Sequence, residues 1–127
     1  MTLPKKKILF IEDEPDQILM IRLRLEKNDF MVVSAEDGLE GIKKAKEEKP
    51  DLILLDVIMP GMNGLEVCRK LRSDPLTKKI PVITTTAAGI DDLEHECLAA
   101  GADACVRKPY DSVDLISKVT SLLQQSK

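Results

Sequence analysis

Residues 52–56 read Leu52-Ile53-Leu54-Leu55-Asp56, four consecutive apolar residues followed by a carboxylate. A continuous apolar run of this length is typical of a strand covered on both faces, as strands are in parallel sheets. Three more apolar stretches of the 127-residue chain also end in polar residues: residues 8–11 before Glu12-Asp13, residues 81–83 before three threonines, and residues 104–107 before Lys108-Pro109. The chain therefore places polar side chains at the ends of four predicted strands.

Strands and helices are predicted to alternate along the whole chain. The strands are expected at residues 8–11, 30–33, 52–55, 80–85 and 102–106. Apolar residues at helical spacing predict helices at residues 15–28, 39–45, 65–71, 93–100 and 115–123. Asn63 is a suitable cap for the third helix, and Gly101 ends the fourth. This alternation predicts an α/β fold with a doubly wound, five-stranded parallel sheet and five helices on its two faces.

The composition favours one folded domain over residues 1–127. The 19 basic and 22 acidic residues leave a net charge of −3, whereas direct nucleic-acid binding usually needs a basic patch. No apolar run approaches the roughly 20 residues of a membrane helix, and the N-terminus lacks a signal-peptide pattern. Cys68, Cys97 and Cys105 are odd in number and lack metal-ligand spacing. We therefore expect a cytoplasmic protein with reduced thiols.

The polar strand ends predict a site for a cation and a phosphoryl group. If the strands are parallel neighbours, these ends meet at the edge where open α/β sheets place their chemistry. Oxygen ligands from Asp13 and Asp56, with Glu12 nearby, suit Mg²⁺, which typically takes one or two carboxylates plus phosphate oxygens. Lys108 supplies a compact positive charge and Thr86 a hydrogen-bond donor for a phosphoryl oxygen. A carboxylate such as Asp56 can attack phosphorus to give an aspartyl phosphate.

At these residues the sequence resembles the receiver domains of two-component response regulators. The matching segments are residues 11–15, 54–64, 81–87 and 106–110. Within the second segment, residues 56–64 carry the pattern Asp-x-x-Met-Pro-x-Met-x-Gly, which is specific to that family. The resemblance runs in order along essentially the whole chain and extends to single-domain receivers of the chemotaxis-regulator kind. It implies a flavodoxin-like sheet with strand order 2-1-3-4-5.

The resemblance implies a role for each residue of the metal site. Asp56 is the expected phosphate acceptor and a metal ligand. Asp13 is expected to bind Mg²⁺ directly and Glu12 to bind it through water. The backbone carbonyl of Ile58 is expected to complete the protein's share of the ligands.

The resemblance also implies how the phosphoryl group is held. Thr86 is similar to the family's switch hydroxyl, which turns inward to bind the phosphoryl group. Lys108 is similar to its phosphate-binding lysine, and the peptide bond from Lys108 to Pro109 is expected to be cis. Receivers commonly carry an aromatic residue three positions before this lysine, and here that position is Cys105. A cysteine is too small to fill the space that the aromatic ring would occupy, so we expect phosphorylation to be read instead through residues 86–88 and the predicted helix at 93–100.

The implied phosphoryl donor is a phosphohistidine on a histidine kinase or a histidine phosphotransfer protein. A downstream protein of unknown identity is expected to bind the face formed by the predicted helix at 93–100, the strand at 102–106 and the helix at 115–123. The protein is expected to be a monomer or a weak homodimer. We expect a signalling switch that catalyses its own phosphorylation and dephosphorylation and is otherwise no enzyme.

Three other functions are compatible with parts of this pattern. A pseudo-receiver would serve as an adaptor without phosphorylation. A phosphohydrolase with an aspartyl nucleophile usually carries a second aspartate two residues later as general acid, a position that Ile58 occupies here. A flavodoxin-like cofactor carrier would need a phosphate-binding loop after the first strand, where this chain has Glu12, Asp13 and Glu14. The missing second aspartate makes the hydrolase fit the sequence less well, and the three acids, which would repel a phosphate, make the carrier fit it less well.

Overall fold

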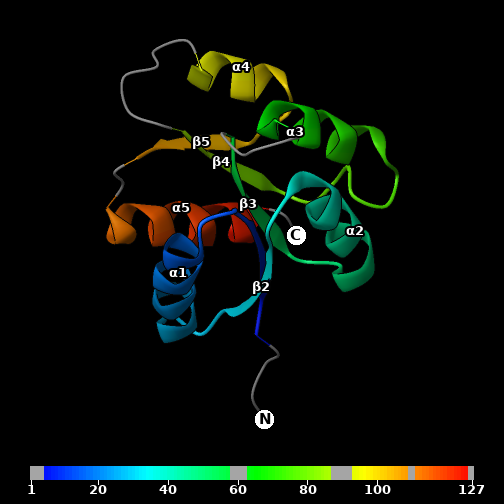
Figure 1. The fold of residues 1–127 in the computed structure, drawn as a ribbon. Coiled ribbons are helices and arrows are strands. Elements are labelled where there is room, and N and C mark those ends of the chain that lie inside the picture. Colours follow the sequence, from blue (N-terminus) through cyan, green and yellow to red (C-terminus); the bar gives the residue numbers. More distant parts are fainter. Residues whose placement is uncertain (1–4, 58–62, 87–92, 109–110, 126–127) are drawn as a thin grey trace.

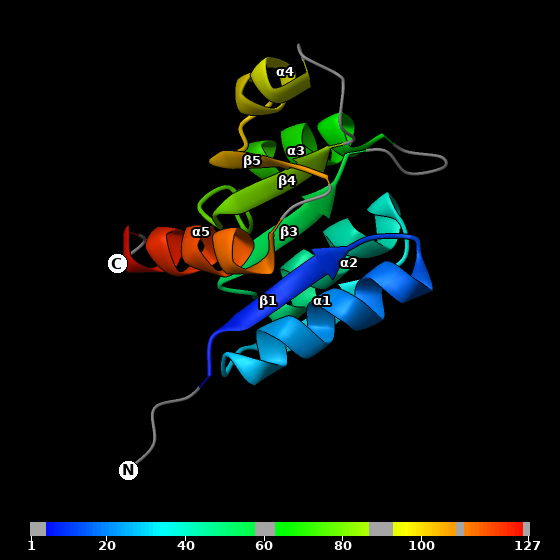
Figure 2. The ribbon, with the colours of Figure 1, turned by 90° about the vertical axis from the view of Figure 1, so that its left-hand side faces the viewer.

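The computed structural model describes residues 5–57, 63–86, 93–108 and 111–125. Five parallel strands form one sheet in the order β2-β1-β3-β4-β5 (Figures 1 and 2). Their bounds are β1 Lys7–Ile11, β2 Met31–Ala35, β3 Leu52–Asp56, β4 Val82–Thr86 and β5 Ala104–Arg107. The predicted fold class and strand order are therefore confirmed.

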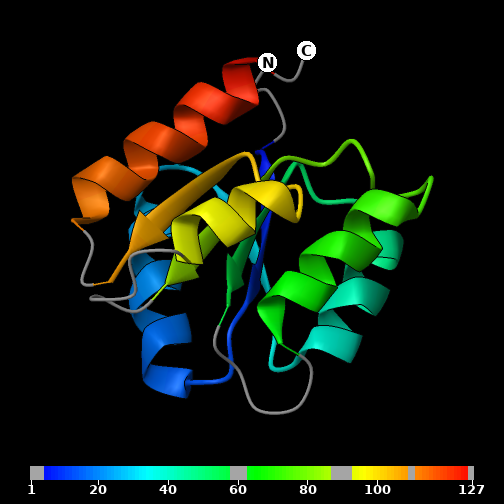
Figure 3. The same cartoon turned by 90° about the horizontal axis from the view of Figure 1, so that it is seen from above.

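Helices cover both faces of the sheet (Figures 1 and 3). The helices α1 and α5 lie on one face, and α2, α3 and α4 lie on the other. Their bounds are α1 Pro15–Lys27, α2 Gly38–Glu48, α3 Gly64–Ser73, α4 Leu93–Ala99 and α5 Ser112–Gln125. Among the described helices, none is long and apolar enough to cross a membrane.

Two hydrophobic cores fix the sheet between these helices. In the central strand β3, Leu52 and Leu54 face the core under α1 and α5, whereas Ile53 and Leu55 face the core under α2, α3 and α4. All four side chains are fully buried. A strand that is buried on both faces has no solvent-exposed position for a polar side chain, which explains its uninterrupted apolar sequence. The first polar residue of β3 is Asp56, at its carboxyl end.

Three strands begin later than predicted, because the N–H groups of their expected first residues donate to neighbouring turns or helix ends instead. Strand β2 begins at Met31, since the Phe30 N–H donates to Leu25 O at the end of α1. Strand β4 begins at Val82, since the Ile80 N–H closes a turn onto Thr77 O. Strand β5 begins at Ala104, two residues later than expected, and ends at Arg107.

Two predicted helix ends are confirmed. Asn63 caps α3, and its Oδ1 accepts a hydrogen bond of 2.7 Å from the Leu65 N–H. Gly101 follows α4 with a φ of 110°, a conformation that side chains with a Cβ rarely adopt. A Cβ on Gly101 would also lie 2.5 Å from Arg72 Cγ, so this position requires glycine for two reasons.

The guanidinium of Arg72 joins α3 to the segments that enter β4 and β5. Its Nε donates to Gly101 O at 2.7 Å, and its Nη1 donates to Ile80 O at 2.6 Å. Its Nη2 pairs with Asp103 Oδ2 at 2.6 Å, and the same oxygen accepts a 2.8 Å hydrogen bond from the Val82 N–H. One side chain therefore satisfies acceptors of two turns that would otherwise depend on water.

We predict that Arg72→Ala lowers the free energy of unfolding by more than about 2 kcal/mol, because several partly buried acceptors lose their donor at once. Urea unfolding followed by circular dichroism measures this change. The control is Arg69→Ala on the exposed side of the same helix, which should change stability by less than about 0.5 kcal/mol. Equal effects of the two substitutions would contradict the assigned role of Arg72.

Candidate functional site

The parallel sheet brings five of the predicted site residues to its carboxyl edge. Asp56 is the last residue of β3, and Thr86 is the last residue of β4. Glu12 and Asp13 directly follow β1, and Lys108 directly follows β5. The strand register aligns Ile11 with Leu55 and Asp56 with Thr85, so the four strands end at nearly the same level.

Three carboxylates gather at this edge and are largely removed from water. One carboxylate oxygen each of Glu12, Asp13 and Asp56 lies within 4.8 Å of the others. Glu12 is 1% exposed and Asp56 is 5% exposed, while Asp13 is half-buried. Negative charges that are this close together and this well shielded from water repel one another strongly unless a cation joins them.

Lys108 places its ammonium between two of these acids. Its Nζ lies 3.1 Å from Glu12 Oε1 and 3.4 Å from Asp56 Oδ2. The Lys108 backbone N–H donates to Thr86 O at 2.7 Å, which fixes the residue beside the end of β4. Burial would lower the pKa of Lys108, but the charges of Asp56 and Glu12 outweigh burial and raise it. The side chain is therefore a permanent cation at neutral pH.

The most buried acid is held by hydrogen bonds as well as by this ion pair. Glu12 Oε2 accepts the backbone N–H groups of Asp13 at 3.0 Å and of Glu14 at 3.3 Å. Burial and the charge of Asp56 nevertheless raise the pKa of Glu12 from 4.5 to about 7, against the opposing effect of Lys108. One ammonium therefore does not fully compensate these carboxylates in the absence of a metal ion.

The donor set of this acidic cluster fits Mg²⁺. All three groups offer hard oxygen ligands, and their oxygens are close enough to surround one ion. A second positive charge here would also relieve the repulsion that remains around Glu12. The predicted fourth contribution, the backbone carbonyl of Ile58, lies outside the described residues, as does the predicted cis bond to Pro109.

Thr86 is buried and lies beside the residue that replaces the expected aromatic ring. Its side chain is 1% exposed, and its hydroxyl accepts a long hydrogen bond of 4.0 Å from the Cys105 thiol. Cys105 is half-buried and packs against the core under α4. The end of β4 therefore contacts β5 through two small side chains.

Gly64 is a structural contributor that sequence reasoning treated only as part of a turn. Its N–H donates at 2.8 Å to the carbonyl oxygen of Val57, the residue that follows Asp56. A Cβ on Gly64 would lie 2.5 Å from Val57 Cα and 2.7 Å from Asp56 O, which are backbone atoms with little freedom to move. Glycine at this position therefore lets the first turn of α3 pack directly against the end of β3. The signal in the sequence is the last glycine of the Asp-x-x-Met-Pro-x-Met-x-Gly pattern.

Comparison with known proteins identifies the same family for almost the whole chain. The response regulator receiver domain model matches residues 8–120. The alkaline phosphatase synthesis transcriptional regulatory protein PhoP of Bacillus subtilis is 37% identical over 121 residues, which are 95% of this chain and 50% of PhoP. Protein PilH of Pseudomonas aeruginosa is 34% identical over 117 residues, which are 92% of this chain and 97% of PilH. The chain thus spans about half the length of PhoP and nearly all of PilH.

A solved structure has the same fold over the same length. The CheY-like response regulator receiver domain protein of Methanospirillum hungatei has a TM-score of 0.87 and 29% sequence identity. The alignment covers 96% of each chain. The shared fold thus includes all the strands whose ends carry the acids and Lys108.

We predict that the metal-free protein loses stability as pH rises from about 4.5 to about 7. In this window folded Glu12 keeps a proton that the unfolded chain has already released, so the free energy of unfolding decreases with pH, by on the order of 2 kcal/mol. Chemical unfolding in EDTA at several pH values measures the slope. Glu12→Gln should flatten it, and the exposed neighbour variant Glu14→Gln should not. An unchanged slope in Glu12→Gln would contradict the assignment.

Proposed function

The chain belongs to the response regulator receiver family, and on this premise we propose that it is a phosphoacceptor switch whose acceptor is Asp56. The observation that carries the proposal is the arrangement of Lys108, whose ammonium lies 3.1 Å from Glu12 and 3.4 Å from Asp56. A carboxylate that is 5% exposed and sits beside the Lys108 ammonium at the end of β3 is largely shielded from bulk water. These are suitable conditions for a nucleophile that must attack a negatively charged phosphoryl group.

The proposed reaction transfers a phosphoryl group from a phosphohistidine to Asp56. A carboxylate oxygen of Asp56 attacks phosphorus, the bond from phosphorus to the histidine nitrogen breaks, and the imidazole leaves with its electron pair. Lys108 donates hydrogen bonds to the phosphoryl oxygens and exchanges part of its pairing with Glu12 for the new charge. Asp56 pairs with Thr85 in the sheet, and the hydroxyl of the next residue, Thr86, supplies a further hydrogen-bond donor for the phosphoryl group.

Glu12, Asp13 and Asp56 are proposed to hold Mg²⁺ during this reaction. When bound, the ion neutralises charge on the transferring phosphoryl group. The support for this assignment is the closeness of three oxygen donors with a single described ammonium among them. Ile58 is proposed as a backbone ligand on the family's pattern alone.

The proposed donor is a histidine kinase or a histidine phosphotransfer protein, and the output is proposed to be a change in the face formed by α4, β5 and α5. The contact between the Thr86 hydroxyl and the Cys105 thiol supports this direction, because it links the carboxyl edge to β5. A movement of Thr86 toward the phosphoryl group would release the Cys105 thiol. On α4, Leu98 is 46% exposed and offers an apolar contact for a downstream protein.

Mg²⁺ is predicted to stabilise the wild-type protein against heat and urea. A ligand that binds only the folded state at ten times its Kd adds about 1.4 kcal/mol to the free energy of unfolding. Asp56→Asn should lose most of this gain, because it removes one of the three anionic ligands. Asp16→Asn, an exposed aspartate in the first turn of α1, should keep it. A wild-type protein that is insensitive to Mg²⁺ would argue against the metal site.

Phosphorylation is predicted to depend on Asp56 and on Mg²⁺. Incubation with phosphoramidate should add one phosphoryl group to the wild type and to Asp16→Asn, as measured by intact-protein mass spectrometry. Asp56→Ala and wild type in EDTA should gain none. Phosphorylation of Asp56→Ala would place the acceptor elsewhere. No phosphorylation of the wild type would instead favour an adaptor that acts without a phosphoryl group.

A further inference from the structure

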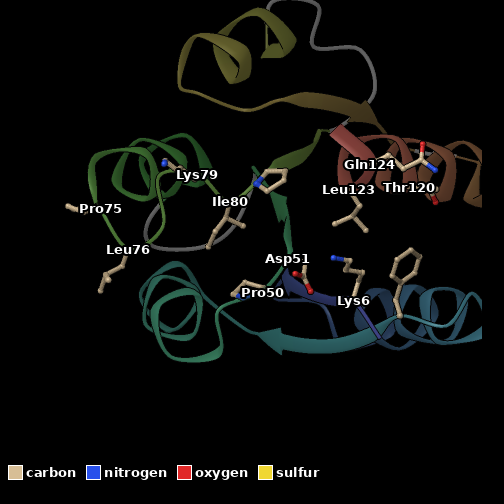
Figure 4. Close-up of a pocket in the computed structure, with 12 residues that line it drawn as sticks. Lys6, Pro50, Asp51, Pro75, Leu76, Lys79, Ile80, Thr120, Leu123 and Gln124 are labelled. Atoms are coloured by element: carbon tan, nitrogen blue, oxygen red, sulfur yellow. The ribbon is translucent and has the colours of Figure 1, made fainter. Parts of the chain in front are cut away.

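A groove lies at the edge of the sheet opposite the carboxylates, where the strands begin (Figure 4). Its volume is about 640 Å³, within the range of roughly 300–1,000 Å³ that is usual for small-molecule sites. One wall is the last part of α5, and the other is the segment between α3 and β4. The site proposed above does not include this groove, and its chemistry does not require it.

The walls of the groove combine apolar and polar side chains, with the apolar surface the larger of the two. Phe30, Ile80 and Leu123 line it from three different segments, and each is partly buried and packs against one of the two cores. Figure 4 shows Ile80 and Leu123 on opposite sides of the same space. Because these side chains are anchored in the cores, the groove is a preformed feature of the fold.

The backbone around the groove offers few free hydrogen-bond donors. The N–H groups of Phe30, Asp51 and Ile80 donate to Leu25 O, Lys7 O and Thr77 O, respectively. Pro50 and Pro81, which also line the groove, have no N–H. An extended peptide would therefore find no row of free donors with which to pair as an added strand. Recognition in this groove has to come from side chains.

Three charged side chains line the groove: Lys6 and Asp51 next to β1 and β3, and Lys79 in the segment between α3 and β4. Lys6, the residue before β1, directs its ammonium into the groove (Figure 4), and no described acid is ion-paired with it. Asp51 lies on the same side, but its Oδ2 accepts a hydrogen bond of 2.7 Å from the Lys7 N–H, which disperses part of its charge. The groove thus joins apolar surface to a lysine that has no ion-pair partner among the described residues.

We propose that this groove binds a small amphipathic carboxylate, with its apolar body between Ile80, Phe30 and Leu123 and its anionic group on Lys6. The cavity volume accommodates a molecule of this class, and burial of its apolar body supplies the main driving force. The Lys6 ammonium supplies charge complementarity and orients the molecule with its carboxylate away from Asp51. A bound molecule would bridge α5 and the start of β4 at the edge remote from Asp56.

Octanoate is the probe that tests this proposal, with octanol as its neutral counterpart. In ¹H–¹⁵N correlation spectra of the full chain, octanoate should shift the amide signals of Phe30, Asp51, Ile80 and Leu123. The signals of Glu12, Asp56 and Lys108 at the opposite edge should stay unchanged. Octanol should bind at least about threefold more weakly, because it lacks the charge that pairs with Lys6.

Three variants distinguish this charge pairing from nonspecific hydrophobic binding. Lys6→Ala should weaken octanoate binding at least about threefold, and Asp51→Asn should strengthen it by a similar factor while its side-chain oxygen still accepts from Lys7. Lys118→Ala, which removes an exposed lysine of α5 outside the groove, should leave the affinity unchanged. The spectra of each variant also show that it is folded.

Equal affinities for octanoate and octanol, or an unchanged affinity in Lys6→Ala, would overturn the proposal. So would signal shifts scattered over other surfaces, such as the exposed leucines of α1. Because none of these readouts involves phosphorylation, failure of this proposal is distinguishable from failure of the proposed phosphoacceptor function.

Discussion

The carboxyl edge of the sheet holds three carboxylates within 4.8 Å of one another, and the ammonium that pairs with them among the described residues is that of Lys108. The rest of the site follows from this excess of negative charge. Repulsion between buried charges favours any species that adds positive charge or removes a negative one. The protein uses the first option through Lys108, which bridges Glu12 and Asp56. The second option appears as the raised pKa of Glu12, which stays partly protonated near neutrality. A divalent cation would satisfy the remaining demand.

The fold supplies the force that keeps these charges together. Each of the strands β1 and β3 is anchored by side chains in both hydrophobic cores, so neither strand end can move away from the other without exposing apolar surface. Gly64 permits α3 to start in contact with the end of β3. Near the other end of the same helix, Arg72 donates hydrogen bonds to the segments that enter β4 and β5. Burial energy distributed over the sheet thus offsets local electrostatic cost at its edge.

The sequence was sufficient to predict the fold class, the strand order by resemblance, and the residues that meet at the carboxyl edge. Its periodicity did not predict strand starts, because those depend on turn hydrogen bonds such as Phe30 to Leu25. It also did not predict that Lys108 lies nearer to Glu12 than to Asp56, since a separation of 96 residues leaves no local pattern. Leu39 was expected to belong to the apolar pattern of its helix, yet it is 70% exposed. The close contact of α2 with Ile11 is instead made by Gly41, whose lack of a side chain carries no periodic signal.

The central claim is that one divalent cation binds between Glu12, Asp13 and Asp56. Paramagnetic Mn²⁺ in place of Mg²⁺ tests it most directly, because it broadens the NMR signals of nearby amides. Substoichiometric Mn²⁺ should first broaden the signals of Glu12, Asp13, Asp56 and Val57, and excess Mg²⁺ should restore them. Signals at the opposite edge of the sheet, such as those of Phe30 and Ile80, should remain sharp. Broadening centred on any other group of residues, or none that Mg²⁺ reverses, would contradict this account.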